Sequence, residues 1–329
     1  MPANRKCRYL IAPDSFKGSF SATEVAEAIA GGVREAGAEA DVCPVADGGE
    51  GTLDVLLAAG GGTRVEADAH DPLRRPIRAG FGLLAGGETA VVEVAAASGL
   101  PLLAPDERDP ERADTFGTGE LIAAAITAGA KTILVAAGGS ATTDGGRGAI
   151  EALRAGGGLQ GARLEVLCDV ETPYEDAARV FAPQKGAEPA AVARLAARLD
   201  DFARTLRRDP RGVPMGGCAG GLSGGLMAAF DADLRPGARF VLDRLGFATR
   251  LDAADAVITG EGQIDDQSLR GKVVGTVAGL CAEAGRPLHV IAGRNALAPE
   301  RAVAAGISSI VEASSLDEIA VAGRAAAAT

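Results

Sequence analysis

The chain contains no tryptophan, and aromatic residues make up only 3% of its 329 residues, although 47% are hydrophobic. The core must therefore be packed mainly from Ala, Val, Leu and Ile. Such a core is typical of helices layered on a sheet. Because the chain exceeds the usual size of one domain, we expect two domains that share a cleft, with one large α/β domain as the alternative.

Cysteine motifs and long apolar runs are also missing. The five cysteines are scattered and show no CxxC spacing, which argues against a disulfide framework and a structural zinc site. No run approaches the ~20 apolar residues that a membrane helix needs, and the apolar stretch near the N-terminus is too short for a signal peptide. We therefore predict a cytoplasmic protein without a membrane partner.

Positive charge is in deficit, since the formal net charge is -11 and the pI is near 4.9. A field of this sign repels polyanions unless a local basic patch overrides it, and the sequence shows no such patch. We expect a small-molecule substrate and no nucleic-acid partner, and leave a homodimer open.

Nucleotide and hydrolase motifs are either absent or lie in the wrong context. The Walker GxxxxGK[ST] does not occur, and the only GxGxxG match, residues 156–161, precedes an expected strand instead of following one, which removes the usual support for a P-loop NTPase and for dinucleotide binding. The only G-x-S-x-G match, residues 221–225, does not directly follow an expected strand as a hydrolase elbow would, and the two histidines lie where structural roles are expected.

Strand-like runs followed by turns and helical stretches are what the sequence does contain. This rhythm is typical of βα units with a parallel sheet. Between 63 and 95 it gives way to consecutive strand-like runs, which predict antiparallel pairing in a new subdomain. Helices are expected to open with capping boxes at Ser21 to Glu24 and Ser315 to Glu318. The βα strands are expected at 7–12, 41–45, 132–137, 164–170, 255–260, 287–293 and 308–313. Further glycine-rich loops are expected at FGTGE (116–120) and GGCAGGLSGG (216–225). A long amphipathic helix is expected over 188–208, with its arginines on a solvated face.

The loop GGSATTDGGRG (138–148) follows one of these strands and surrounds Asp144 with glycine. Glycine lets backbone N–H groups approach an anion closely, and a helix that starts next adds its positive end. The loop is therefore a candidate anion cradle, with Asp144 as a metal ligand or proton acceptor. The alternative is a tight turn in which Asp144 only caps the helix.

Further carboxylates share this placement at strand ends. In open α/β sheets ligands bind beyond the carboxyl ends of the strands, where carboxylates gathered without histidine would repel one another unless a cation lay among them. Mg²⁺ with a phosphate ligand resolves that conflict. Three of only five lysines, Lys17, Lys185 and Lys272, adjoin glycine in such loops, where an ammonium could reach a phosphate oxygen. The loop carboxylates are Asp14, Asp47, Glu50, Asp144, Asp169, Glu261 and Asp265.

Seven motifs, in order over nearly the whole chain, resemble the glycerate kinase type I family. They are IAPDSFKGSFSA, PVADGGEGT, FGTGELI, GGSATTDGG, FAPQKGA, CAGGLSGGL and DAVITGEGQID. The resemblance implies phosphorylation of D-glycerate with ATP and Mg²⁺, usually to 2-phosphoglycerate. It also implies a two-domain α/β fold, with a Rossmann-like parallel-sheet domain formed by both chain ends (1–68 and 250–329) and an inserted mixed α/β domain (69–249).

From these motifs we assign candidate roles around a cleft that closes to exclude water. Asp47 or Asp144 would accept or orient the hydroxyl proton, and Lys17 and Lys185 would neutralise phosphate oxygens. Glu261 and Asp265 would hold the metal. The candidates for cofactor binding are Gly138, Gly139, Ser140, Thr118, Gly220, Gly221 and Lys272, and those for substrate binding are Asp14, Ser15, Glu50 and Asp169.

Three positions depart from the family pattern. Thr143 and Thr172 stand where the family usually has Asn, and Gln263 stands where it usually has Arg, a fork of donors suited to carboxylate or phosphate. A kinase or phosphatase for a related sugar acid is therefore the alternative reaction. A regulator that binds nucleotide without transferring phosphate is the alternative from another class.

Overall fold

The computed structural model describes residues 6–328, which divide into two compact units. Unit 1 consists of the described residues up to Asp47 and from Ala238 onward, and unit 2 runs from Gly48 to Gly237. The sequence analysis set these boundaries at 68/69 and 249/250. The first of those positions lies inside a strand, Gly62–His70, that pairs along its whole length with the next strand of unit 2.

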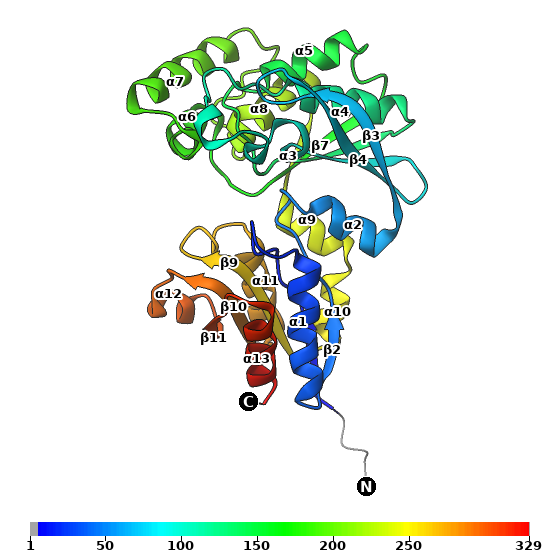
Figure 1. Ribbon diagram of the computed structural model, residues 1–329, viewed down its shortest axis with the longest axis vertical. Helices are drawn as coiled ribbons and strands as arrows, with labels where there is room; N and C mark the ends of the chain where they lie inside the picture. The colour runs from blue at the N-terminus through cyan, green and yellow to red at the C-terminus, as the bar shows by residue number, and fades with distance from the viewer. Residues whose placement is uncertain (1–5, 329) are drawn as a thin grey trace. The chain divides into compact units, whose positions relative to one another are not determined.

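Unit 1 is an α/β unit whose strands come from both ends of the chain (Figure 1). Its strands are β1 (Arg8–Ile11), β2 (Glu39–Val42), β9 (Ala256–Ile264), β10 (Leu288–Asn295) and β11 (Ile307–Glu312). Its helices are α1 (Ala22–Glu35), α9 (Gly237–Arg244), α10 (Phe247–Ala253), α11 (Val273–Ala284), α12 (Pro299–Ala304) and α13 (Leu316–Ala327).

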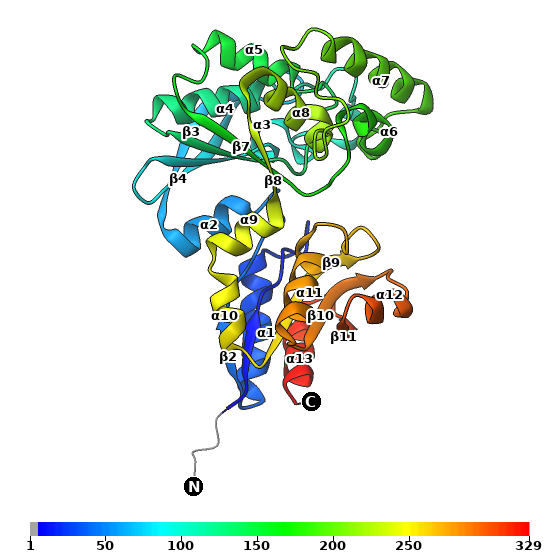
Figure 2. The ribbon, with the colours of Figure 1, turned by 180° about the vertical axis from the view of Figure 1, so that it is seen from behind.

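The five strands of unit 1 form a parallel sheet in the order β11-β10-β9-β1-β2. Successive residues of a strand point to opposite faces. Tyr9 and Ile11 accordingly pack into a core with α1 and α13, whereas Leu10 and Ala12 pack into a second core with α10 and α11 (Figure 2). Helices thus cover both faces, and the predicted parallel sheet built from both chain ends is confirmed.

Helices α1 and α13 pack against each other unusually closely (Figure 1). A Cβ atom built on Gly32 would lie 1.9 Å from the carbonyl oxygen of Ala320, and one built on Gly323 would lie 2.7 Å from that of Ile29. Glycine at these two positions therefore permits the crossing.

The two predicted capping boxes differ. Helix α1 has the complete box between Ser21 and Glu24. At α13 Ser315 Oγ accepts from the backbone N–H of Glu318, but the carboxylate of Glu318 accepts from Ser314 instead of the Ser315 backbone. The second box is therefore only half formed.

Unit 2 contains a six-stranded mixed sheet in the order β3-β4-β5-β6-β7-β8. Its strands are β3 (Gly62–His70), β4 (Pro76–Leu84), β5 (Thr89–Glu93), β6 (Thr132–Ala136), β7 (Arg163–Cys168) and β8 (Asp233–Pro236). Its helices are α2 (Thr52–Gly60), α3 (Ala95–Ser98), α4 (Phe116–Thr127), α5 (Arg147–Ala155), α6 (Ala177–Phe181), α7 (Pro189–Ala203) and α8 (Cys218–Phe230).

Pairing in this sheet is antiparallel from β3 to β5 and parallel from β5 to β8. The antiparallel pairing predicted for 63–95 is confirmed. Strand β8 was not predicted, because its sequence DLRP is mostly polar and ends in proline. Such a segment is tolerated as an edge strand, where β8 lies.

Two glycine-rich segments predicted as loops are helical. FGTGE (116–120) forms the first turns of α4, and most of the segment GGCAGGLSGG belongs to α8. Helix α8 is kinked near its start, because Ala219, Gly220 and Gly221 adopt left-handed backbone angles. Within the segment predicted as a loop, these three residues are therefore non-helical.

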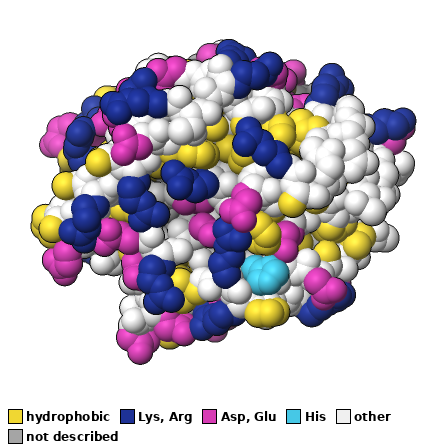
Figure 3. Space-filling view, turned by 90° about the horizontal axis from the view of Figure 1, so that it is seen from above, with side chains coloured by type: hydrophobic (Ala, Val, Ile, Leu, Met, Phe, Trp, Pro, Cys, Tyr) yellow, Lys and Arg dark blue, Asp and Glu magenta, His cyan; other side chains and the backbone are white. Residues whose placement is uncertain are grey.

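Among residues 6–328 no helix is long and apolar enough to cross a membrane. On the face shown in Figure 3, basic and acidic side chains are interspersed with apolar ones.

Candidate active site

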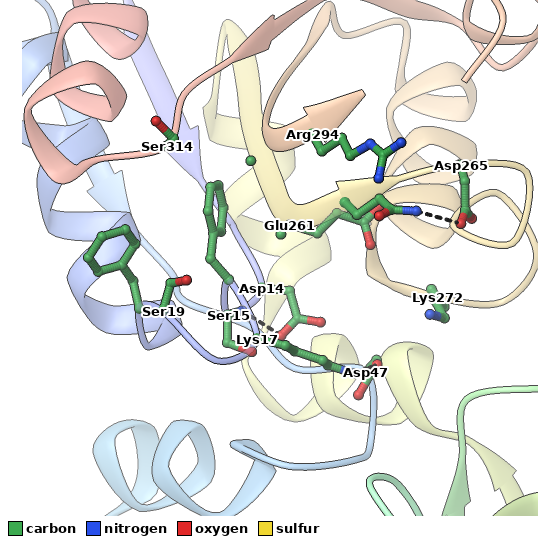
Figure 4. Close-up of a pocket in the computed structure, with 15 residues that line it drawn as sticks. Asp14, Ser15, Lys17, Ser19, Asp47, Glu261, Asp265, Lys272, Arg294 and Ser314 are labelled. Atoms are coloured by element: carbon green, nitrogen blue, oxygen red, sulfur yellow. Dashed lines mark hydrogen bonds and ion pairs between the residues drawn. The ribbon is translucent and has the colours of Figure 1, made fainter. Parts of the chain in front are cut away.

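A pocket of about 530 Å³ opens in unit 1, within the size range of small-molecule sites. Its walls come from the loops after β1 and β2, from β9 with the loop that follows it, and from the end of β10 (Figure 4). These segments meet because the carboxyl ends of parallel strands lie at one edge of a sheet. Seven of the residues assigned from sequence line this pocket: Asp14, Ser15, Lys17, Asp47, Glu261, Asp265 and Lys272.

The loop after β1 is seated on the sheet by Phe16. Its backbone forms a tight bridge to Phe20, with two hydrogen bonds of 2.9 and 3.0 Å. Cβ atoms built on Gly260, Gly262 and Gly293 would lie 3.4 to 3.5 Å from Phe16. The buried Phe16 thus packs against β9 and β10 at ordinary contact distance, which fixes the backbone of its neighbour Lys17.

Lys17 and Asp47 form an ion pair, with 2.9 Å between Nζ and Oδ2. The Asp47 side chain is 2% exposed and that of Lys17 is 51% exposed. The lysine is therefore anchored by a buried carboxylate while much of its side chain faces solvent.

The charged form of Asp14 is destabilised in this pocket. It is buried, and Oδ1 accepts from the backbone N–H of Ser15 at 2.7 Å. Burial, and next the negative charge of Asp47, hold the pKa of Asp14 well above its usual range. A cation in the pocket would lower that pKa again.

Glu261 belongs to strand β9, which runs three residues further than Glu261, whereas the sequence analysis placed it in a loop. Burial raises the pKa of Glu261 to about 7, and its Oε1 is buried without a hydrogen-bond partner. Figure 4 shows the carboxylates of Asp14 and Glu261 turned toward the same open space. An unpartnered buried carboxylate oxygen is a suitable ligand for a hard cation.

Asp265 is already engaged within its own loop. Oδ1 accepts from the backbone N–H groups of Gln267 and Ser268 at 2.8 and 3.2 Å, and Oδ2 accepts from Gln263 at 3.4 Å. Within residues 6–328 no group of three or more His, Cys, Asp or Glu side chains has the geometry of a metal centre. The pocket therefore offers carboxylate oxygens, which are the ligand type that Mg²⁺ prefers. Glu261 is the better candidate ligand, because one of its oxygens has no hydrogen-bond partner, whereas both oxygens of Asp265 accept hydrogen bonds.

The remaining assigned residues lie in unit 2. Lys185 is buried there, and its Nζ donates to Ser140 Oγ at 2.9 Å and to the carbonyl oxygen of Thr142 at 2.5 Å. Burial lowers the pKa of Lys185 to about 8, although the nearby charges of Asp144 and Asp169 act to raise it. The lysine ties the loop 138–148 to the segment 183–185.

The glycines of that loop allow close backbone approaches. Gly139 has φ +69°, and a Cβ on Gly138 would lie 2.6 Å from the Cα of Gly49. A Cβ on Gly139 would lie 3.6 Å from the carboxylate of Glu50, and one on Gly220 would lie 2.0 Å from the carbonyl oxygen of Thr142. The structure thus brings the assigned glycines and Glu50 around one loop.

Asp144 holds this loop to two helices. Its Oδ2 accepts from the backbone N–H groups of Thr115 and Gly148 at 3.0 and 2.9 Å and from Thr115 Oγ1 at 2.8 Å. Its Oδ1 accepts from the backbone N–H of Gly146 at 3.1 Å. The capping role considered from sequence is present, and it leaves Oδ1 with spare acceptor capacity.

Three further assigned residues of unit 2 lie around the loop 138–148 and Lys185. Thr118 is fully buried in α4 and hydrogen-bonds Ser98 at 2.7 Å between their hydroxyl oxygens, beneath the loop. Gly221 lies in the kink of α8, close to Tyr174. Asp169 follows β7 and acts on Lys185 through its charge.

Sequence reasoning missed two residues that matter for this geometry. Thr115 holds Asp144 but precedes a motif that was assigned as a loop. Arg294 lines the pocket of unit 1 and follows the predicted strand 287–293, so the strand-end argument could have found it.

Comparisons with known proteins show the family of the chain. The model of the "Glycerate kinase family" matches residues 9–157 and 154–325. "Glycerate kinase" of Bacillus subtilis (strain 168) is 41% identical over 323 residues, covering 87% of this chain and 85% of the relative. "Glycerate 2-kinase" of Escherichia coli (strain K12) is 37% identical with the same coverage. A crystal structure from Salmonella typhimurium LT2, provisionally described as glycerate kinase 2, is 36% identical with a TM-score of 0.81 over 98% of each chain. The chain therefore belongs to the glycerate kinase family and is a kinase.

Proposed function

We propose that this kinase transfers the γ-phosphoryl group of ATP to D-glycerate and forms 2-phosphoglycerate. The observation that supports this proposal most directly is the pocket of unit 1, where Lys17 and Lys272 lie with four buried or part-buried carboxylates in a volume suited to a small ligand. Membership of the glycerate kinase family supports the acceptor, and the name of the Escherichia coli relative supports transfer to the 2-hydroxyl.

Two lysines supply the positive charge for the reaction. Phosphoryl transfer depends mostly on positioning and on neutralising charge at the phosphate oxygens. Lys17 is held by buried Asp47, and Lys185 is held by Ser140 and Thr142, so neither ammonium must be ordered when the substrate binds. The prediction that both groups act in one reaction is tested below.

Proton transfer from the glycerate hydroxyl falls to a carboxylate. Asp47 and Asp144 are the candidates, and each is fixed by hydrogen bonds that restrict its rotation. Oδ1 of Asp144 accepts a single hydrogen bond from the protein, which leaves it able to accept another from a substrate hydroxyl. Asp14, Ser15, Glu50 and Asp169 remain the candidates for orienting the acceptor.

Mg²⁺ would be held by Glu261, through its unpartnered Oε1, and by the less engaged oxygen of Asp265. When bound, the ion would neutralise phosphate charge. The chain's contribution is to keep these carboxylates in place, since β9 fixes Glu261 and its own loop fixes Asp265. The glycines at 138 and 139 and Ser140 would present backbone donors to phosphate oxygens.

The reaction is tested by phosphorus NMR of the product after incubation with D-glycerate, ATP and Mg²⁺. The 2-phosphate resonance is expected. The 3-phosphate would refute the regiochemistry, and ADP formation only with L-glycerate or a short sugar acid would refute the acceptor. Tight ATP binding with no acceptor phosphorylated would favour the regulator instead.

The lysine roles are tested with Lys17→Met and Lys185→Met. Each should raise the barrier by about 2 to 4 kcal/mol, as other preorganised electrostatic contacts do. Lys131→Met is the control, because Lys131 lies on the surface, 72% exposed, and pairs with Glu88. Near-normal turnover in both test variants would refute the assignment.

A further inference from the structure

A second, smaller cavity lies in unit 2 and has a different character from the pocket of unit 1. Its volume is about 100 Å³, below the range of pockets for whole drug-sized ligands, so it suits one compact group. We call it the arginine cavity, because its lining includes Arg74, Arg112, Arg147 and Arg198.

These arginines come from separate segments of unit 2. Arg74 lies between β3 and β4, Arg112 before α4, Arg147 at the start of α5 and Arg198 in α7. Sequence reasoning treated the arginines of the long amphipathic helix as a solvated face. All four are exposed, yet arginines from four separate segments line this one cavity, which favours an anionic ligand.

Most of the guanidinium donors are still available. Arg198 donates to the carbonyl oxygen of Glu111 at 2.8 Å, and Arg147 stacks on the ring of Phe202 at 4.7 Å. Arg112 makes no ion pair within residues 6–328. Arg74 is the exception, because it binds both Asp114 and Glu151. A guanidinium carries five N–H donors, so three of the four retain most of theirs.

The cavity keeps a net positive charge. Asp114 and Asp144 also line it, and Glu151 pairs with Arg74 from outside the lining, so together they offset three of the four positive charges. An anion is therefore favoured over a neutral group, and the fork of guanidinium donors suits phosphate oxygens. The first N–H groups of α5 are already taken by Asp144 and Thr115, so the side chains must supply the binding.

Thr143 gives an independent indication of a ligand. It lines the cavity and is 2% exposed, yet its Oγ1 has no hydrogen-bond partner among the described residues. A buried hydroxyl without a partner is costly, and a turn of the Thr143 side chain would offer it to an anion oxygen in the cavity.

We propose that the arginine cavity binds a small molecule through its phosphate group. This site shares Asp144 with the proposed reaction, on which its role therefore rests, but none of the residues that line it lines the pocket of unit 1. Occupation would brace the Thr143 and Asp144 end of the loop that carries Ser140, and so would stabilise the loop from one side.

The test is calorimetric titration of the full chain with inorganic phosphate, without nucleotide and at constant ionic strength. Arg112→Gln and Arg147→Gln should each weaken the binding about tenfold or more, as expected for a charge-assisted hydrogen bond. Thr143→Val should weaken it severalfold without a change of charge. Arg154→Gln is the matched control, because Arg154 is exposed at the other end of α5 and does not line the cavity.

Equal phosphate binding in the wild type and both arginine variants would overturn the proposal. So would a loss of the same size in Arg154→Gln, which would indicate a general charge effect. A parallel titration with D-glycerate separates carboxylate from phosphate: arginine dependence for D-glycerate alone would also overturn it. Arg147→Gln loses a stacking contact, so Arg112→Gln keeps the test valid if Arg147→Gln misfolds. Because binding is measured without turnover, its failure is distinct from a failure of the proposed reaction.

Discussion

Thr115 grips the carboxylate of Asp144 with two groups at once, its backbone N–H at 3.0 Å and its hydroxyl at 2.8 Å. The same hydroxyl oxygen accepts from the backbone N–H of Ala149 at 3.0 Å. One buried side chain thus joins the starts of α4 and α5 to the loop 138–148. Asp144 depends on Thr115 for its orientation.

Replacement of Thr115 by valine should therefore destabilise the protein and misplace Asp144. The shape is retained, but Asp144 loses a donor and Ala149 loses an acceptor in a fully buried site. A cost of about 1 to 3 kcal/mol in the free energy of unfolding is expected. Denaturant unfolding measures it, and steady-state kinetics should show a lower kcat with a smaller change in KM.

Thr115→Ser is the control for this substitution, because serine keeps the hydroxyl and loses only a methyl group. It should recover most of the stability and of kcat. If serine and valine behave alike, the hydroxyl bridge does not position Asp144.

Lys185 should make stability depend on alkaline pH. Its pKa is about 8 in the folded chain against an ordinary 10.5, chiefly because it is buried. Between these values the unfolded chain binds more protons than the folded one, so stability rises with pH in that window. Below pH 8 the lysine is charged in both states and contributes no slope.

The comparison protein for this effect is Lys185→Met. The free energy of unfolding of the wild type, relative to the variant, should rise by up to about 3 kcal/mol between pH 8 and 10.5. Subtracting the variant removes the contributions of tyrosines and other lysines. Parallel profiles for the two proteins would show that the buried amine keeps its ordinary pKa.

The placement of the pocket residues in unit 1 could be predicted because it follows from topology. Asp14 and Asp47 come directly after β1 and β2, and strands of a parallel sheet end at a common edge. The strand rhythm therefore brought residues 33 positions apart into one pocket. Strand-end placement also found Ser140, whereas Lys185 was assigned because it adjoins glycine and lies in a family motif. Neither argument predicted that the two side chains touch.

The contacts made by the first turn of α4 could not be predicted from the strand pattern. Glycine in FGTGE indicated a loop, but Gly117 and Gly119 lie in α4, where Cβ atoms would meet the carbonyl oxygens of His70 at 1.8 Å and Ala149 at 2.5 Å. Glycine there serves close packing, which only the tertiary structure determines. The role of Thr115 was missed with it.

Replacement of Glu261 should raise the stability of the protein and lower its activity. Its carboxylate is buried with one oxygen unpartnered, and its pKa of about 7 means that ionisation opposes folding. Stability from this group is full below its ordinary pKa of 4.5 and is lost as pH rises through 7. Glu261→Gln should therefore raise the free energy of unfolding at pH 8 by about 1 to 3 kcal/mol.

The same substitution should lower turnover and raise the Mg²⁺ concentration needed for half-maximal activity. Asp266→Asn is the control, because Asp266 is exposed and pairs with Arg301 outside the pocket lining. A variant at 261 that is less stable and fully active would contradict both parts of the argument.

The crossing of α1 and α13 gives a test that does not involve the site. Gly32 is buried where an added Cβ would lie 1.9 Å from the carbonyl oxygen of Ala320 and 2.8 Å from the backbone nitrogen of Arg324. Gly32→Ala must force the helices apart, and overpacking of this kind costs about 1 to 3 kcal/mol.

The neighbouring Gly31 has nothing within 4 Å of its added Cβ. Gly31→Ala should therefore stabilise α1 by about 0.5 to 1 kcal/mol, because alanine loses less backbone entropy in a helix. Thermal and denaturant unfolding should move the two variants in opposite directions, and a shift of the same sign in both would show that the helices do not cross as closely as described.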